Sequence, residues 1–292
     1  MGQGLMTPAE ENAWPAPAKL NLFLHIVGRR DDGYHLLQTV FQFLDYGDRL
    51  WFESAPAGMV AREGGPAGVA ELDDLSVRAA RTLLQVTGLR EGVRLCLDKR
   101  LPAGGGLGGG SSDAATVLLV LNRLWRAGLS QDDLAELGLM LGADVPVFVR
   151  GTAAWAEGVG ERLEPLPDLP EPWYAVVKPP VSIATADLFA DPKLTRDCPP
   201  ITIRDFLLGQ AGNVFEPVVR ARYPEVAQAL ERLSAHAPAR LTGTGACAFA
   251  AFADADSARG ALRDLPEGWH GFAARGCNLS PVHARLGATP AF

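Results

Sequence analysis

Cysteines and long apolar runs are both scarce in this sequence. Its 292 residues include four cysteines, and none of them lies at the spacing of a zinc site. We therefore expect free thiols in a reducing compartment rather than a disulfide framework. No apolar stretch approaches the roughly 18 residues of a membrane helix, and the N-terminus lacks the charged and apolar regions of a signal peptide. These absences favour a soluble, cytoplasmic protein with no membrane partner.

Positive charge is also in short supply. The chain has 27 lysines and arginines against 34 aspartates and glutamates, a formal net charge of −7, and it has no basic tract. Binding to duplex nucleic acid is driven by counterion release and needs a dense patch of Lys and Arg. We therefore expect no nucleic-acid partner, and nothing in the sequence indicates an obligate protein partner. A small anion can still bind where backbone amides and one or two cations converge.

The composition that is present is that of a globular protein, with 48% hydrophobic residues, 21% charged residues, 32 glycines and 22 prolines. The length suits one large domain or two packed ones. Four prolines within residues 164–174 mark the best candidate for a boundary. We accordingly expect a loose leader over residues 1–15, an N-terminal domain over 16–165 and a C-terminal domain over 166–292.

Hydrophobic spacing predicts strands and helices that do not alternate regularly, which favours the α+β class in two lobes. Strands are expected from residue 19 to Gly28, in a second segment closed by Gly47 and Asp48, and over 93–100, 174–178, part of 242–252 and 271–275. Helices are expected over 75–86 with a stop at Gly88, from about 113 to 127, after the N-cap Ser130, around 202–235 and, as the last one, from about Asp256.

A glycine-rich segment follows the strand expected over 93–100. It has the sequence LPAGGGLGGGSSD, and six of the seven residues from 104 to 110 are glycine. A strand that leads through such a loop into a helix directs several N–H groups at one spot near the positive end of the helix dipole. Glycine permits close approach of a phosphate, and Ser111, Ser112 and Asp113 are placed to cap the helix. Because so many glycines cost conformational entropy on ordering, we favour phosphate binding over a flexible turn without a ligand.

Two well-known phosphate loops fit this segment poorly. The P-loop pattern fails because no lysine follows the glycines. The G-x-G-x-x-G dinucleotide pattern fits at Gly104, Gly106 and Gly109, but a run of glycines satisfies it almost by default. Residues 98–103 also separate these glycines from the strand, whereas the first glycine of that pattern should follow the strand directly. A nicotinamide cofactor is therefore disfavoured.

Three further segments carry recognisable patterns. They are PAKLNLFLHIVGRRDDGYHLLQTVFQFLDYGD, LGADVPVFVRGTAAWAEGVGE and RLTGTGACAFAAF. Together with LPAGGGLGGGSSDAA they resemble the motifs of the GHMP small-molecule kinases, in the branch whose substrate carries a cytidine diphosphate group. The matching blocks run from about residue 18 to the NLSP segment at 278–281, and the set is much more specific than any one motif. The resemblance implies two lobes of mixed sheets and helices, with an ATP-binding catalytic N-terminal domain, a C-terminal domain on the substrate side and the active site in the cleft between them.

The resemblance assigns catalysis to Lys19 and Asp144. Asp144 would accept the proton of the substrate hydroxyl, and Lys19 would stabilise the charge that is transferred. The plainer alternatives are a solvated lysine at the start of a strand and an aspartate that caps a helix. Asn21 lies on the same strand face as Lys19 and would either orient the substrate or hydrogen-bond a neighbouring loop. No Ser/His/Asp triad or H-E-x-x-H motif competes with this pair.

Ligand binding follows from the same resemblance. Tyr34 would stack on cytosine, His35 would bind its edge, and Phe189 would supply a ring on the opposite face with Thr185 close by. The alternatives are a surface Tyr-His pair and a core phenylalanine. ATP is expected as co-substrate, with Mg²⁺ to offset its charge. The expected ATP-binding residues are Lys99, Pro102, Ala103, Gly104, Gly105, Gly106, Leu107, Gly108, Gly109, Gly110, Ser111 and Ser112.

Some assignments stay open. No ligands of Mg²⁺ are assigned, although Ser111 or Ser112 is a candidate. Lys99 and its neighbour Arg100 form a basic pair that could equally be solvated. Position 74 is Asp where some relatives have Asn near the adenine, so we assign no contact there. The rival functions are another GHMP kinase, acting on homoserine, mevalonate or a sugar, and a non-catalytic nucleotide-binding protein on the same scaffold.

Overall fold

The computed structural model of this protein describes residues 10–288. Residues 1–9 of the predicted leader lie outside this range. The rest of the leader contains a short 3₁₀ helix, η1 (Glu10–Asn12), and the start of the first strand. Within the described range no helix combines the length and the apolar character that crossing a bilayer requires.

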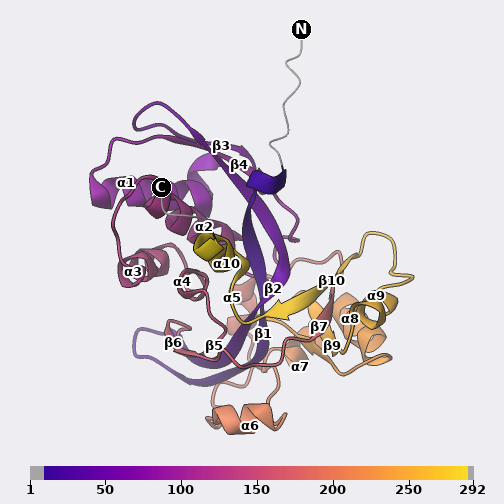
Figure 1. Ribbon diagram of the computed structural model, residues 1–292. Coiled ribbons are helices and arrows are strands. Elements are labelled where there is room, and N and C mark those ends of the chain that lie inside the picture. Colours follow the sequence, from indigo (N-terminus) through magenta and orange to yellow (C-terminus); the bar gives the residue numbers. More distant parts are fainter. Residues whose placement is uncertain (1–9, 289–292) are drawn as a thin grey trace.

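Two long antiparallel strands form the centre of the molecule (Figure 1). They are β1 (Trp14–Arg29) and β2 (His35–Ser54). The prediction that the second strand closes at Gly47 and Asp48 is wrong, because β2 continues through both residues. A Cβ atom on Gly47 would lie 2.1 Å from the carbonyl oxygen of Ala16 on β1. The glycine therefore permits the close approach of two strands instead of ending one.

The remaining strands extend this pair. Over residues 10–288 ten strands form one sheet, whose main path runs β3-β4-β2-β10-β7-β9-β8, while β1 and β5 also pair with β2 and β6 pairs with β5. β10 joins the two halves, because it pairs with both β2 and β7. These strands are β3 (Val60–Gly64), β4 (Val93–Asp98), β5 (Ala154–Gly158), β6 (Arg162–Pro165), β7 (Trp173–Lys178), β8 (Ala239–Leu241), β9 (Ala248–Phe252) and β10 (His270–Cys277).

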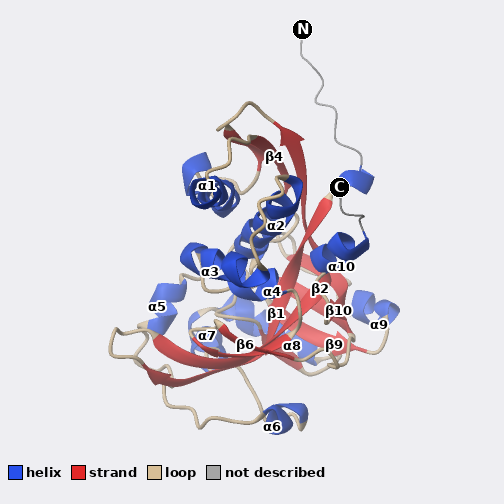
Figure 2. Ribbon diagram, turned by 60° about the vertical axis from the view of Figure 1, so that its left-hand side comes forward, coloured by secondary structure: helices blue, strands red, loops and turns tan. Residues whose placement is uncertain are grey.

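Helices pack on one side of the N-terminal part of the sheet (Figure 2). After a 3₁₀ turn, η2 (Glu71–Asp73), α1 (Leu75–Thr87) begins at the N-cap Asp74. It ends at Gly88 with φ 69°, as the sequence predicts. The predicted N-cap Ser130 also forms a capping box at the start of its helix, α3. The other helices here are α2 (Gly109–Leu124), α3 (Gln131–Leu141) and α4 (Val145–Arg150).

A second hydrophobic core lies in the C-terminal part, between β7, β8 and β9 and the helices beside them. Leu24 and Ile26 of β1 belong to this core, whereas Val282 near the C-terminus packs into the first core. The predicted boundary between residues 165 and 166 falls between β6 and β7 and stays a prediction. The prediction that the last helix begins near Asp256 is wrong, since another helix follows it. The helices are α5 (Thr185–Phe189), α6 (Ile203–Leu207), α7 (Glu216–Arg222), α8 (Pro224–Ser234), α9 (Ala255–Gly260) and α10 (Pro281–Ala288).

Candidate active site

The glycine-rich segment connects β4 to α2 as a loop. Gly104, Gly106 and Gly108 have φ values of 65°, 75° and 73°, a region that residues with a Cβ atom rarely adopt. α2 begins at Gly109 with Gly108 as its N-cap and no capping side chain. The prediction that residues 111–113 cap this helix is therefore wrong, because they lie inside it. A helix end without a capping side chain leaves N–H groups available to an anion.

Two cavities meet at this glycine loop. The larger has a volume of about 920 Å³ and the smaller about 460 Å³, and both are lined by Gly104, Gly106, Gly108 and Ser111. Every residue predicted for catalysis and substrate binding lines the larger cavity. Every predicted ATP-binding residue except Ser112 lines the smaller one. Two ligands that occupy these cavities would therefore meet at the glycine loop.

Lys19 and Asp144 lie together in the larger cavity, with Nζ 3.2 Å from Oδ2. Lys19 is only 2% exposed, so it is not the solvated lysine of the plainer alternative. Asp144 occupies the N-cap position of α4, but its side chain accepts no capping hydrogen bond. Its carboxylate is instead 36% exposed and available to a ligand in the cavity.

Asn21 joins this pair, because it points to the same side of β1 as Lys19. Lys19 Nζ donates a hydrogen bond to Asn21 Oδ1 at 2.6 Å, and Asn21 Nδ2 donates to Thr39 Oγ1 at 2.9 Å. The backbone N–H of Asn21 donates to Thr242 Oγ1, also at 2.9 Å. Thr242 belongs to the segment RLTGTGACAFAAF, so this contact ties that segment to the strand that carries Lys19.

Lys19 also contacts the glycine loop. Its backbone N–H donates to the carbonyl oxygen of Leu107 at 3.0 Å. A Cβ atom on Gly108 would lie 3.2 Å from Cε of Lys19. The ammonium group has three N–H donors, and those directed at Asn21 and Asp144 leave one for an anion held by the loop.

The other end of the larger cavity is lined by aromatic rings. Tyr34 lies just before β2 with its side chain 65% exposed. Phe189 stacks on His35, with ring centroids 4.8 Å apart and an interplanar angle of 24°. Phe189 is partly buried and also packs edge-on against Phe215 at 5.0 Å, so it bridges the cavity and the second core. Thr185 lies close by, at the start of the helix that ends with Phe189.

The surroundings of His35 favour the neutral form of its ring. Burial, and then the charges of Arg29 and Arg196, lower the pKa of His35 from its usual value. One ring nitrogen of a neutral imidazole donates a hydrogen bond and the other accepts one. Nε2 has no hydrogen-bond partner within the described chain. The ring is therefore suited to bind the polar edge of a nucleobase.

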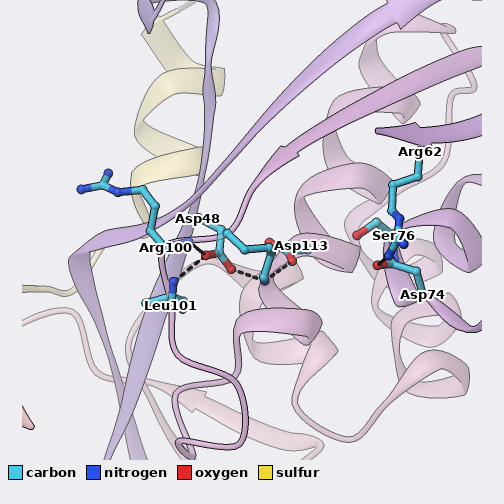
Figure 3. A network of polar contacts seen from close by, with 8 residues as sticks. Asp48, Arg62, Asp74, Ser76, Arg100, Leu101 and Asp113 are labelled. Atoms are coloured by element: carbon cyan, nitrogen blue, oxygen red, sulfur yellow. Dashed lines mark hydrogen bonds and ion pairs between the residues drawn. The ribbon is translucent and has the colours of Figure 1, made fainter. Parts of the chain in front are cut away.

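Charged side chains line the smaller cavity. Lys99 Nζ is bound by the carboxylates of Asp48 and Asp113, the latter at 2.5 Å, and its side chain is 18% exposed, so Lys99 is not a solvated residue. Asp74, which also lines this cavity, accepts a hydrogen bond from Ser76 N at 2.7 Å and pairs with Arg62 at 2.5 Å (Figure 3). Both of its oxygens are thus engaged within the protein.

The residues near the glycine loop fit a magnesium ion. Among the described residues no three acidic, histidine or cysteine side chains gather as a ready-made cage. Mg²⁺ commonly takes one or two oxygen ligands from the protein and the rest from phosphate and water. Ser111 lines both cavities, and its Oγ would lie 3.8 Å from a Cβ atom on Gly142, two residues before Asp144. Ser112 lines neither cavity, so Ser111 is the better of the two candidates.

Several residues of this site were not found from the sequence. Thr39 and Asp48 hold predicted site residues in place, and Phe215 supports Phe189. Asp113 had a local signal, because it follows the glycine run, but it was taken as a helix cap. The other three have no local signal, since each acts on a segment that is distant in the sequence.

Comparison with known protein families and relatives gives a consistent result. The GHMP kinases N terminal domain matches residues 74–152, and the GHMP kinases C terminal domain matches residues 202–271. The 4-diphosphocytidyl-2-C-methyl-D-erythritol kinase of Halorhodospira halophila is 57% identical over 279 residues, which are 95% of this chain and 97% of the relative. The enzyme of the same name from Pseudomonas aeruginosa is 57% identical over 272 residues, which are 93% and 96%.

Solved structures show the same similarity. A crystal structure of 4-(cytidine 5'-diphospho)-2C-methyl-D-erythritol kinase superposes with a TM-score of 0.79 and 35% identity, covering 91% of this chain and 99% of that one. A mevalonate kinase superposes with a TM-score of 0.64 at 14% identity, covering 91% and 99%, which is a likeness of fold alone. The prediction of an α+β fold of the GHMP kinase type is confirmed.

Proposed function

Because the chain belongs to the 4-diphosphocytidyl-2-C-methyl-D-erythritol kinases, a branch of the GHMP family of ATP-dependent small-molecule kinases, we propose that it phosphorylates the 2-hydroxyl of 4-diphosphocytidyl-2-C-methyl-D-erythritol. The donor is the γ-phosphoryl group of ATP. The reaction is a step of non-mevalonate isoprenoid precursor synthesis. Residues 16–165 bind ATP and carry the catalytic pair, residues 166–292 form the substrate side, and the enzyme works in the cytoplasm.

The arrangement of the two cavities around one loop is the observation that supports this proposal. The larger cavity holds the Lys19–Asp144 pair, the smaller cavity is lined by the charged side chains of Lys99 and Asp74, and the glycine loop is common to both. Phosphoryl transfer needs two substrates aligned at one point, where little covalent chemistry is asked of the protein. A shared loop of backbone N–H groups meets that need, because it can hold the phosphates of ATP beside the acceptor hydroxyl.

In the proposed reaction the substrate hydroxyl gives its proton to Asp144 while its oxygen attacks the γ-phosphorus. The bond from that phosphorus to the oxygen bridging the β- and γ-phosphates breaks, and ADP leaves with the electron pair. Lys19 supplies positive charge to the group in transfer, since it contacts the loop through Leu107 and the base through the ion pair at 3.2 Å. Asn21 keeps Lys19 in place by accepting its hydrogen bond.

The hydroxyl of Ser111, which lines both cavities, would hold Mg²⁺ beside the phosphates. When bound, the ion offsets the negative charge of the phosphates. Ser111 and the amides of the glycine loop orient the nucleotide from the protein side.

The aromatic end of the larger cavity is proposed to bind cytidine. Tyr34 offers an exposed ring for stacking, which is worth about 1–3 kcal/mol per base. The lowered pKa of His35 favours the neutral ring, and its buried Nε2 has no hydrogen-bond partner within the described chain, which suits a contact with the cytosine edge. Phe189 and Thr185 form the wall beyond it. These side chains distinguish a cytidine-bearing alcohol from a bare one.

A comparison of acceptor substrates, each in its own reaction, tests the proposal. The purified protein is supplied with ATP, Mg²⁺ and, in separate reactions, the cytidine diphosphate-linked alcohol, mevalonate, homoserine or galactose, and ADP release and the phosphorylated product are measured. We expect one ADP per product with the first acceptor and background release with the others. Transfer to another acceptor would instead support the rival kinases. Nucleotide binding without any transfer would support a non-catalytic protein.

A further inference from the structure

A buried cluster of charged side chains lies beneath the glycine loop, made of Asp48, Lys99 and Asp113. Oδ1 of Asp48 accepts hydrogen bonds from the backbone N–H groups of Arg100 at 2.6 Å and Leu101 at 2.7 Å, where the loop begins (Figure 3). Oδ2 of the same carboxylate accepts a hydrogen bond from Lys99 Nζ. Asp48 is 1% exposed, so these protein groups use both of its oxygens.

Asp48 also lies against the other end of the loop. A Cβ atom on Gly109, the first residue of α2, would lie 3.3 Å from Oδ2 of Asp48. Lys99 extends this link into the helix, because its Nζ also donates to Oδ2 of Asp113 at 2.5 Å. One carboxylate on β2 therefore bonds the start of the loop and lies near its end, and one lysine connects it to the helix that follows.

The charges of this cluster depend on one another. Burial would lower the pKa of Lys99, but the carboxylates of Asp113 and Asp48 more than offset it, so its pKa lies above the usual value. Burial raises the pKa of Asp113 to about 8, although the charge of Lys99 acts in the opposite direction. Lys99 therefore keeps its charge, and removing it would leave Oδ2 of Asp48 and Oδ2 of Asp113 without the donor that they share.

We propose that Asp48 is a positioning residue for ATP, which holds the two ends of the glycine loop and orients Lys99, with Asp113 as the second anchor of that lysine. Glycines lose much conformational freedom when a loop is ordered. When the loop is already ordered before ATP binds, this loss of conformational entropy does not weaken the binding of ATP. The inference rests on the proposed function, because it takes the glycine loop to be the ATP site.

Two matched substitutions on β2 test this role. Asp48→Asn keeps an oxygen for the backbone N–H groups but turns an amide toward Lys99. Asp45→Asn is the control, because Asp45 accepts the backbone N–H of Arg275 at 2.7 Å, on a different element from the loop. Calorimetry with a non-hydrolysable ATP analogue should show about tenfold weaker binding for Asp48→Asn, with the affinity for CDP within about twofold of wild type. Asp45→Asn should change neither affinity.

A second pair of variants keeps the test decisive if Asp48→Asn fails to fold. Lys99→Met should weaken binding of the ATP analogue, because it removes the donor that Oδ2 of Asp48 and Oδ2 of Asp113 share. Adding Asp113→Asn replaces the acid with an amide that can donate a hydrogen bond toward Asp48, so the double variant should bind the analogue at least about threefold more tightly than Lys99→Met alone. If Lys99 served only as a direct ligand of phosphate, the two variants would bind equally weakly, which would overturn the proposal.

Other results separate this inference from the proposed function. Wild-type affinity for the ATP analogue in a folded Asp48→Asn variant would overturn the inference. Equal losses for the analogue and CDP would also overturn it, because they would indicate a purely structural role. A wild-type protein that binds the analogue but not CDP would overturn the proposed substrate, while a selective loss in Asp48→Asn would still support the positioning role.

Discussion

The two cavities of this active site are built from different parts of the chain. The smaller one is walled by a continuous stretch of backbone, the glycine loop, with a buried ion cluster beneath it. The far end of the larger one is walled by the side chains of Tyr34 and His35, at the start of β2, and of Phe189, at the end of α5. A backbone wall suits phosphates, which every nucleotide carries. A wall of aromatic and polar side chains suits a particular base.

This difference determines how a substitution in each wall affects ligand binding. Backbone geometry depends on φ values and close contacts, so adding one Cβ atom at the wrong place removes a whole binding surface. A substitution in the aromatic wall removes only one ring, and the lost stacking costs about 1–3 kcal/mol of binding free energy. The substitutions below test this contrast, starting with the proposed base in the larger cavity.

Asp144→Asn should cause the largest loss. The amide is nearly the same size but cannot accept the proton of the substrate hydroxyl, and loss of a general base typically costs about 10²–10⁴-fold in turnover. The affinities for CDP and for an ATP analogue should stay close to wild type, because neither wall is altered. Steady-state kinetics together with calorimetry measure both quantities. Turnover near the wild-type value would make Asp144 a structural residue and would contradict the proposed mechanism.

Gly106→Ala should break the backbone wall. Gly106 has φ 75°, and a Cβ atom there would lie 2.4 Å from the carbonyl oxygen of Thr242. Gly58→Ala is the matched control, because Gly58 has φ 76° and no atom within 4 Å of the added Cβ. Both variants lose the conformational freedom of glycine, but only the first must displace backbone.

We expect Gly106→Ala to weaken binding of the ATP analogue by on the order of a hundredfold, and Gly58→Ala to leave it within about twofold. The affinities of the two variants for the ATP analogue are measured by calorimetry, at a temperature below the melting temperature of each. An affinity of Gly106→Ala as close to wild type as that of Gly58→Ala would contradict the assignment of the glycine loop to ATP.

The contrast between the walls also explains what the sequence could predict. A run of glycines between a strand and a helix is local, so the loop between β4 and α2 was predicted from residues alone, as was the end of α1 at Gly88. The pairing of Lys19 with Asn21 followed from their spacing on one strand. Short-range geometry of this kind depends only on neighbours in the chain.

The parts that escaped prediction depend on distant neighbours. Gly47 was interpreted as the end of a strand, because the approach of Ala16 to it cannot be seen in a local pattern. Asp48 was overlooked for the same reason, since its partners are 51 to 53 residues away. The aromatic end of the larger cavity was assigned only through family resemblance. Local spacing gave no indication that Phe189 would stack on His35.

Tyr34→Ala should have a smaller effect that is confined to the side-chain wall. Losing one base–aromatic stack should weaken CDP binding by about 1–3 kcal/mol. The ATP analogue should bind as in wild type, because Tyr34 lines only the larger cavity. Paired titrations with CDP and the analogue distinguish the outcomes. Unchanged CDP affinity would mean that Tyr34 takes no part in binding the base, and an equal loss for both ligands would indicate a folding defect.

Asp113→Asn should have the smallest effect of these substitutions. It tests the buried cluster beneath the backbone wall, because it should change how the stability of the protein depends on pH. The pKa of Asp113 is raised from 3.8 to about 8 by burial, so the folded state keeps a proton that the unfolded state releases. Wild-type stability from this group is therefore full below its unfolded pKa and is lost as pH rises toward the folded value. His35 acts in the opposite sense, because its lowered pKa favours the neutral form and its contribution is lost as pH falls.

Since Asn cannot titrate, the melting temperature of Asp113→Asn relative to wild type should be higher at about pH 8 than at about pH 6, by on the order of 2 °C. Thermal unfolding at the two pH values, with Asp45→Asn as control, measures this difference. A difference that is the same at both pH values would show that Asp113 is already ionised across this range, and that Lys99 outweighs burial in setting its charge.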